Sequence, residues 1–81
     1  MEAGGAALYA DVSGELFELG LTYRTGRYVD QDLVVAHKWF NLAALKGNRE
    51  AIDYRIDLAR EMTEQQIAVA QKLAREWLAA N

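Results

Sequence analysis

The sequence predicts an all-α protein made of two stacked antiparallel helix hairpins, the second less regular than the first. Three observations support this prediction. The 81 residues include no proline, the residue that most strongly breaks helices. Long stretches consist of Ala, Leu, Glu, Gln, Lys and Arg, which are good helix formers. Apolar residues recur three or four positions apart, and β-branched residues never alternate with polar ones over the length of a strand.

The first hairpin is expected over residues 13–48, after a lead-in at residues 1–12 that we expect to be loosely ordered. Ser13 is the predicted N-cap of a helix over residues 14–24, because its hydroxyl can accept a hydrogen bond from a backbone N–H one turn on. Gly20 lies on the apolar face of that helix, where it costs about 1 kcal/mol relative to alanine. Its presence there predicts the close approach of a second helix.

The second helix of this hairpin is expected over residues 32–46. Gly26 suits the left-handed position at which the first helix stops. Asp30 or Asp32 can cap the second helix and interact favourably with its dipole. A Gly-Asn pair at residues 47–48 predicts the end of this helix.

Residues 49–81 are predicted to form the second hairpin, with helices over residues 50–61 and 64–79. Between them, Thr63 and Gln66 have the spacing of a capping box, in which each side chain accepts a hydrogen bond from the backbone of the other residue. The predicted core combines large apolar residues with alanines at helical spacing: Leu16, Leu19, Tyr23, Ala36, Trp39, Phe40, Ala43, Ile52, Ile56, Leu73 and Trp77.

The two hairpins share a pattern of apolar positions. An offset of 34 residues aligns the second and fourth predicted helices, with large and small side chains exchanged: Ala36, Trp39, Phe40, Ala43 and Ala44 align with Ala70, Leu73, Ala74, Trp77 and Leu78. A repeat of about 34–36 residues is typical of stacked helical hairpins, which usually number three or more. Two repeats therefore predict either a piece of a longer array or association through the uncovered N-terminal face.

A long spaced pattern runs through the first hairpin: Leu19-Gly20-x-x-Tyr23-x-x-Gly26, then Val29 and Asp32, then Ala36-x-x-Trp39-Phe40-x-x-Ala43-Ala44-x-x-Gly47-Asn48. This pattern resembles the Sel-one-like repeat, a relative of the tetratricopeptide repeat that occurs in some bacterial regulators and envelope proteins. The resemblance implies an αα superhelix that binds other proteins. The chain departs from the family at Tyr28, usually glycine, and at Asp30, often proline. The second hairpin matches less well and is interpreted as a degenerate terminal repeat.

Residues able to support catalysis or metal binding are few. His37 is the single histidine, and there is no cysteine. A general base would need an orienting carboxylate, and no spacing in the sequence requires one. One histidine also makes no pattern of metal ligands. His37 is therefore interpreted as a structural residue, and we expect no catalysis, metal or cofactor.

Charge and hydropathy disfavour two classes of partner. Twelve acidic and nine basic residues give a net charge of −3 without a basic stripe, which disfavours nucleic acid. No apolar run approaches the roughly 20 residues that span a bilayer, and the first five residues lack the positive charge of a signal peptide. These features predict a cytoplasmic protein that binds neither nucleic acid nor membrane.

Four residues are the candidates for partner binding. Phe17 and Leu21 lie one turn apart, off the main apolar stripe of the first helix, and either line a groove or pack inside the protein. An offset of 36 residues relates them to Asp53 and Asp57, one turn apart on the third helix. These carboxylates form either a site for acid–base chemistry or a cation, or a solvated face. Together the four predict a groove with an apolar end and an acidic end.

The first function hypothesis is a protein–protein adaptor that binds an extended or helical peptide with its first and third helices. The alternative is a structural cap or self-assembly unit of a longer helical-repeat array. An enzyme is the least favoured class.

Overall fold

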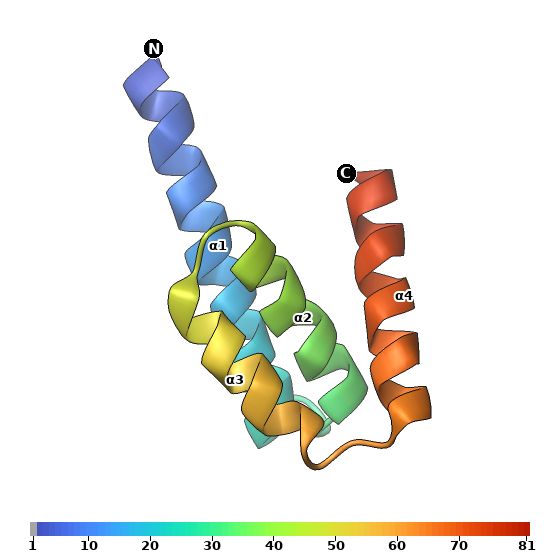
Figure 1. Ribbon diagram of the computed structural model, residues 1–81. Helices are drawn as coiled ribbons and strands as arrows, with labels where there is room; N and C mark the ends of the chain where they lie inside the picture. Colours follow the sequence, from blue (N-terminus) through green and yellow to red (C-terminus); the bar gives the residue numbers. More distant parts are fainter. Residues whose placement is uncertain (1) are drawn as a thin grey trace.

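The computed structural model describes residues 2–81, with side chains described from Val12 onward. Its helices are α1 (Glu2–Thr25), α2 (Leu33–Leu45), α3 (Arg49–Ala59) and α4 (Glu64–Ala80). Within these residues there is no strand, so the predicted all-α class is confirmed. Consecutive helices run in opposite directions and form two antiparallel hairpins, α1–α2 and α3–α4 (Figure 1).

Local hydrogen bonds set most helix ends as predicted. Asp32 is the N-cap of α2, and its Oδ1 accepts from the Val35 N–H at 3.1 Å. Asn48, expected only as part of the stop after the preceding helix, caps α3 in the same way, accepting at 3.0 Å from the backbone three residues on. At the start of α4, Thr63 Oγ1 accepts from the Gln66 N–H at 3.1 Å, and Gln66 Oε1 accepts from the Thr63 N–H at 2.9 Å. The predicted capping box is therefore confirmed.

The start of α1 differs from the prediction. The helix begins at Glu2 and not at Gly14, so Ser13 lies inside it and is not an N-cap. The expected lead-in at residues 1–12 is part of this helix, apart from Met1, which lies outside the described residues. The sequence before Ser13 is rich in alanine, a strong helix former. Once the helix continues through Ser13, the backbone N–H groups that follow bond within the helix and need no cap.

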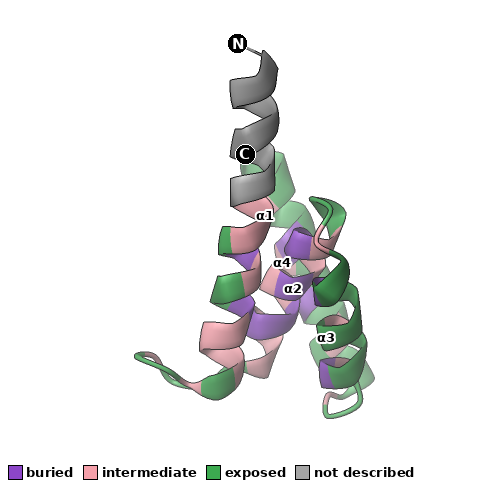
Figure 2. Ribbon diagram, turned by 90° about the vertical axis from the view of Figure 1, so that its left-hand side faces the viewer, coloured by how far each residue is buried: buried purple, intermediate pink, exposed green. Residues whose placement is uncertain are grey.

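The helix α2 lies at the centre of the molecule and packs against each of the other three helices. Figures 1 and 2 show α1 and α3 on one side of it and α4 on the other. Burial concentrates on α2 and on the sides of its neighbours that face it (Figure 2). The buried residues of α2 are Ala36, His37, Phe40, Leu42 and Ala43. By contrast, α3 and α4 diverge from their short turn and contact each other far less than each contacts α2.

At Gly20, α1 approaches the Phe40 ring of α2 closely, as the place of this glycine on the apolar face predicts. A Cβ atom added there would lie 2.5 Å from Cδ1 and Cε1 of the Phe40 ring. Phe40 is fully buried, and a densely packed interior gives its ring little room to move aside. Glycine is therefore required for this crossing.

The loop between α1 and α2 contains two residues with a left-handed backbone. Gly26 has φ of 76°, which confirms its predicted place just after the first helix. Tyr28 has φ of 70° at the position where the resembled family usually has glycine. A side chain in this conformation costs about 1–2 kcal/mol. Tyr28 therefore adopts a backbone conformation that favours glycine.

The predicted core is right for most of the first hairpin and wrong for one side of α3. Leu16, Ala36, Phe40 and Ala43 are buried, whereas Leu19, Ile52 and Ile56 are 37%, 40% and 48% exposed. The helix α3 instead buries Ala51 and Leu58. The small side chain of Ala51 lets α3 lie close to α2, which turns the two isoleucines away from the core. The remaining predicted core residues are half-buried: Tyr23, Trp39, Leu73 and Trp77.

Candidate interaction surface

Phe17 and Leu21, two of the predicted binding residues, are half-buried where α1 meets α3. The Phe17 ring centroid lies 5.7 Å from that of Phe40 and 5.1 Å from that of Tyr54, the second contact being edge-on. Such aromatic pairs contribute about 0.5–1.5 kcal/mol beyond the area they bury. Leu21 packs against the buried cluster that contains Phe40. The structure thus gives both residues a packing role between α1 and the rest of the molecule.

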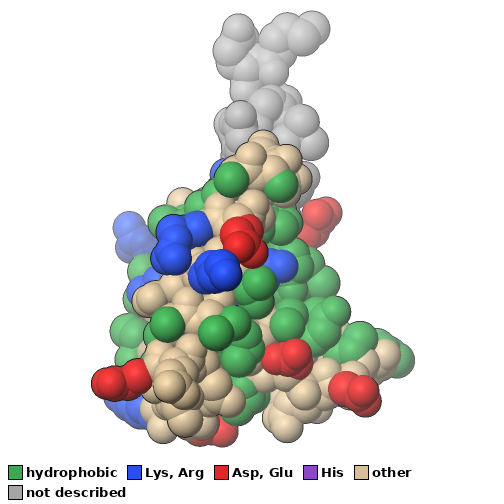
Figure 3. All heavy atoms as spheres, turned by 90° about the vertical axis from the view of Figure 1, so that its right-hand side faces the viewer, with side chains coloured by type: hydrophobic (Ala, Val, Ile, Leu, Met, Phe, Trp, Pro, Cys, Tyr) green, Lys and Arg blue, Asp and Glu red, His purple; other side chains and the backbone are tan. Residues whose placement is uncertain are grey.

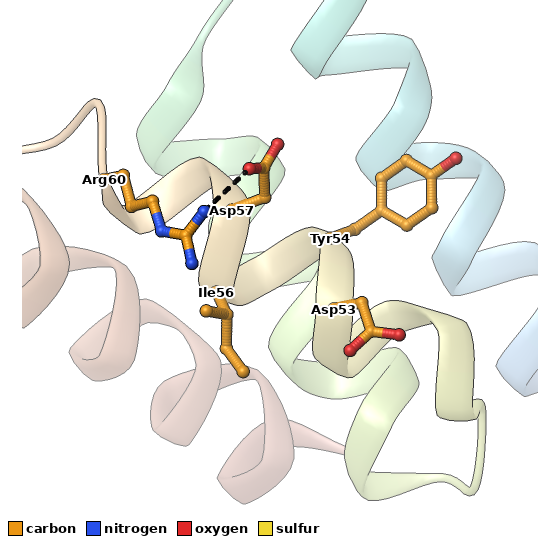
Figure 4. A pocket seen from close by; sticks show the side chains of 5 residues that line it. All are labelled: Asp53, Tyr54, Ile56, Asp57 and Arg60. Carbon is orange, nitrogen blue, oxygen red and sulfur yellow. Dashed lines mark ion pairs between the residues drawn. The ribbon is translucent and has the colours of Figure 1, made fainter.

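Asp53 and Asp57, the other two predicted residues, are exposed on α3. Both line an open hollow of about 400 Å³ (Figure 4). The described residues of this hollow are Asp53, Tyr54, Ile56, Asp57 and Arg60. Asp57 Oδ1 lies 3.6 Å from Arg60 Nη1, and Asp53 forms no ion pair with a described residue. The predicted apolar pair therefore lies at a packed junction and the predicted acidic pair on an open face.

The side chains of α3 point in three directions. Ala51 and Leu58 are buried in the core. Tyr54 points toward α1, and Ile56 points away from it, toward the side on which α4 lies (Figure 4). Ile52 lies one turn before Ile56 and shares its side of the helix. We call Ile52, Ile56 and the adjoining hollow the free side of α3.

Apolar exposure also occurs elsewhere, but without this arrangement. Leu45, Val69 and Leu78 are exposed on α2 and α4, and Tyr28 is exposed in the loop. Figure 3 shows hydrophobic side chains spread over the lower part of the face that carries α4, with basic side chains gathered above them. On α3, by contrast, the exposed Ile52 and Ile56 lie one turn apart, and Ile56 lines the hollow. Sequence reasoning missed this surface because it assigned both isoleucines to the core.

An ion pair also links α1 to the turn that follows α3. Arg24 Nη2 donates to Glu61 Oε2 at 2.8 Å. The two side chains are 26% and 52% exposed, so water weakens their attraction and the pair contributes less than about 1 kcal/mol. Apolar packing around Phe17 therefore contributes most of the contact between these helices.

His37 is only 3% exposed, and its Nδ1 has no hydrogen-bond partner among the described residues. Burial, and secondarily the positive charge of Arg55, lower the pKa of His37 below its usual 6.5. Arg55 in turn donates to Asn41 Oδ1 at 2.8 Å. A general base would instead have a carboxylate to orient it and stabilise its charged form. This environment suits a neutral, packed imidazole.

Two further findings concern the described part of the chain as a whole. No group of three or more histidine, aspartate or glutamate side chains there could hold a metal ion. None of its helices combines the length and the apolar character needed to cross a membrane.

No protein-family model, curated protein or solved structure matches the chain. Its function has to be argued from the geometry of its own residues.

Proposed function

We propose that the chain is a non-catalytic protein-interaction module that binds a helix of its partner on the free side of α3. The observation that carries the proposal is the exposure of Ile52 and Ile56, 40% and 48%, beside a hollow with charged walls. Exposed apolar residues grouped within a polar rim are typical of protein-binding surfaces. The resemblance of the first hairpin to Sel-one-like repeats supports the same function.

The spacing of the two isoleucines favours a helical partner. They lie along the axis of α3, so a helix placed beside α3 can contact both with residues three or four apart. Asp53 and Asp57 then form the polar rim, where charges chiefly affect the association rate and the choice of partner. Tyr54 and Arg60 are of residue types that often carry binding energy in interfaces.

The test compares Ile56→Ser with Val69→Ser. Both side chains are 48% exposed, so both changes replace a half-exposed β-branched side chain, one on α3 and the other on α4. The immobilised wild type and both variants are incubated with lysate of the organism that makes the protein, and captured proteins are quantified by mass spectrometry. We expect Ile56→Ser to reduce capture by about tenfold, a change of 1.4 kcal/mol, with an unchanged far-UV circular dichroism spectrum.

Val69→Ser is expected to capture as much as the wild type. Equal losses for the two variants, or no loss for either, would contradict binding at the free side of α3.

A further inference from the structure

The helices α1 and α3 can be aligned by the residues they bury. Leu16 of α1 and Ala51 of α3 are 4% and 0% exposed and belong to the same buried cluster. Matching them gives an offset of 35 residues, one less than the offset expected from the sequence pattern. The last residues of the two helices, Thr25 and Ala59, give a similar offset of 34 residues. Burial and helix ends therefore agree to within one residue, and we use the offset of 35 that matches the buried residues.

This alignment changes which residues correspond. It matches three apolar residues of α1 with three of α3: Phe17, Leu19 and Leu21 with Ile52, Tyr54 and Ile56. Within the chain, α3 covers Phe17, chiefly through the Tyr54 ring at 5.1 Å. The residue that corresponds to Phe17 is Ile52, which is 40% exposed, and the residue that corresponds to Tyr54 is Leu19, which is 37% exposed. The chain therefore carries a second residue of each kind, Ile52 in the place of Phe17 and Leu19 in the place of Tyr54. Both are exposed, and neither makes the contact that Phe17 and Tyr54 make with each other.

We infer that the helix covering the free side of α3 is α1 of a second copy of this chain, which names the partner and rests on the function proposed above. Leu19 lies two positions after Phe17 and so on roughly the opposite side of α1 from the contact with α3. A second copy can sit on α3 as α3 sits on α1. Its Leu19 then packs on Ile52, as Tyr54 packs on Phe17 within the chain.

Charges beside the two surfaces are complementary and favour a second copy over an unrelated helix. Arg49 lies one turn before Ile52, and Glu15 lies one turn before Leu19. Both charged residues are exposed, and neither forms an ion pair with a described residue. A basic edge facing an acidic edge fixes the orientation of two copies and speeds their encounter.

The two surfaces differ from each other, so the contact is heterologous. An assembly of any length therefore has a free α3 surface at one end and a free α1 surface at the other. Copies continue to add unless the assembly closes into a ring. Association is therefore expected to exceed a dimer as the concentration rises.

Sedimentation velocity of the purified chain from about 10 μM to about 1 mM, the range of weak association, tests the inference. We expect the mean sedimentation coefficient of the wild type to rise past that of a dimer. Leu19→Asp and Ile52→Asp are each expected to stay monomeric, because each places a charge in the apolar contact. Mixed together, they are expected to form a one-to-one dimer and nothing larger, since each variant keeps the surface that the other has lost.

A charge exchange provides a second test if either aspartate variant fails to fold by circular dichroism. Arg49→Glu is expected to weaken association about tenfold, and adding Glu15→Arg is expected to restore it. A wild type that stays monomeric at about 1 mM would overturn the inference, as would an association that neither the mixed variants nor the charge exchange restores. If a different protein is then captured in a manner dependent on Ile56, the proposed function stands without this inference. If neither self-association nor capture that depends on Ile56 is observed, both the inference and the proposed function are wrong.

Discussion

The two hairpins are held together in different ways. In the first, α1 crosses α2 so closely at Gly20 that the Phe40 ring occupies the space of a side chain. In the second, α3 and α4 diverge after their turn and pack separately on α2, where Ala51 and Ala70 are fully buried. A short antiparallel connection therefore does not by itself make two helices pack. The first hairpin is stabilised by its own contact, whereas the second depends on the first.

Among the changes that test this comparison, Gly20→Ala is expected to have the largest effect on the free energy of unfolding. The added Cβ would lie 2.5 Å from the buried Phe40 ring, and overpacking of this kind costs about 1–3 kcal/mol. Gly14→Ala is the matched control, because no atom lies within 4 Å of its added Cβ. Both variants gain about 1 kcal/mol of helix propensity. In urea unfolding, Gly14→Ala is expected to be more stable than Gly20→Ala by the overpacking cost. Equal stabilities of the two variants would mean that α1 and α2 cross less closely than described.

Acid is expected to have a smaller effect on stability, through the buried His37 of α2. Burial first and Arg55 second lower the pKa of the folded state, while the unfolded state keeps a pKa near 6.5. Above that pH both states are neutral at this residue. As the pH falls below it, the unfolded state takes up a proton before the folded state does. The free energy of unfolding therefore decreases until the pH passes the lowered folded-state pKa.

The measurement for His37 is urea unfolding at about pH 7.5 and about pH 5.5, on either side of the unfolded pKa. His37→Gln removes the ionisation and serves as the comparison. We expect the wild type to lose more stability than the variant between the two pH values. Equal losses would assign the pH dependence to other groups.

The smallest expected effect is at the ion pair that joins the two hairpins. Arg24→Ala and Glu61→Ala, alone and combined, form a double-mutant cycle that isolates their coupling. The side chains are 26% and 52% exposed, so we expect a coupling of about 0.2–1 kcal/mol that decreases with salt. A coupling above about 2 kcal/mol would show that charge contributes more than packing around Phe17 to the contact between the two hairpins.

Helix ends could be predicted from the sequence wherever a single side chain determines them. Asp32 and the Thr63–Gln66 pair bond to backbone groups three residues away, so the signal lies entirely within a short window. Ser13 is the counterexample. A serine caps only where a helix would otherwise begin, and that depends on the helix propensity of the residues before it.

The buried side of α3 could not be read from periodicity alone. Ile52 and Ile56 fit a helical apolar stripe as well as Ala51 and Leu58 do, and hydrophobicity favours the isoleucines. The outcome depends on how close α3 can lie to α2, and a small residue such as Ala51 decides that.

The exposure of two of the four predicted binding residues could be read from the sequence. Asp53 and Asp57 are exposed and share a hollow, as a pair one turn apart on a solvated face allows. Phe17 and Leu21 were recognised as lying off the main stripe of α1, but the pattern within one helix cannot show that another helix covers them. Their role in a binding groove was therefore beyond what periodicity can decide.

The central place of α2 has a consequence for the order of folding. It packs on α1 and α3, the helices joined to it by short loops, and on α4, which is one helix farther along the chain. Chains with such local contacts fold fast. The α1–α2 crossing needs nothing that comes later in the sequence, whereas α4 needs α2 in place before it can bury its alanines. During synthesis from the N-terminus, the first hairpin can therefore close before α4 leaves the ribosome.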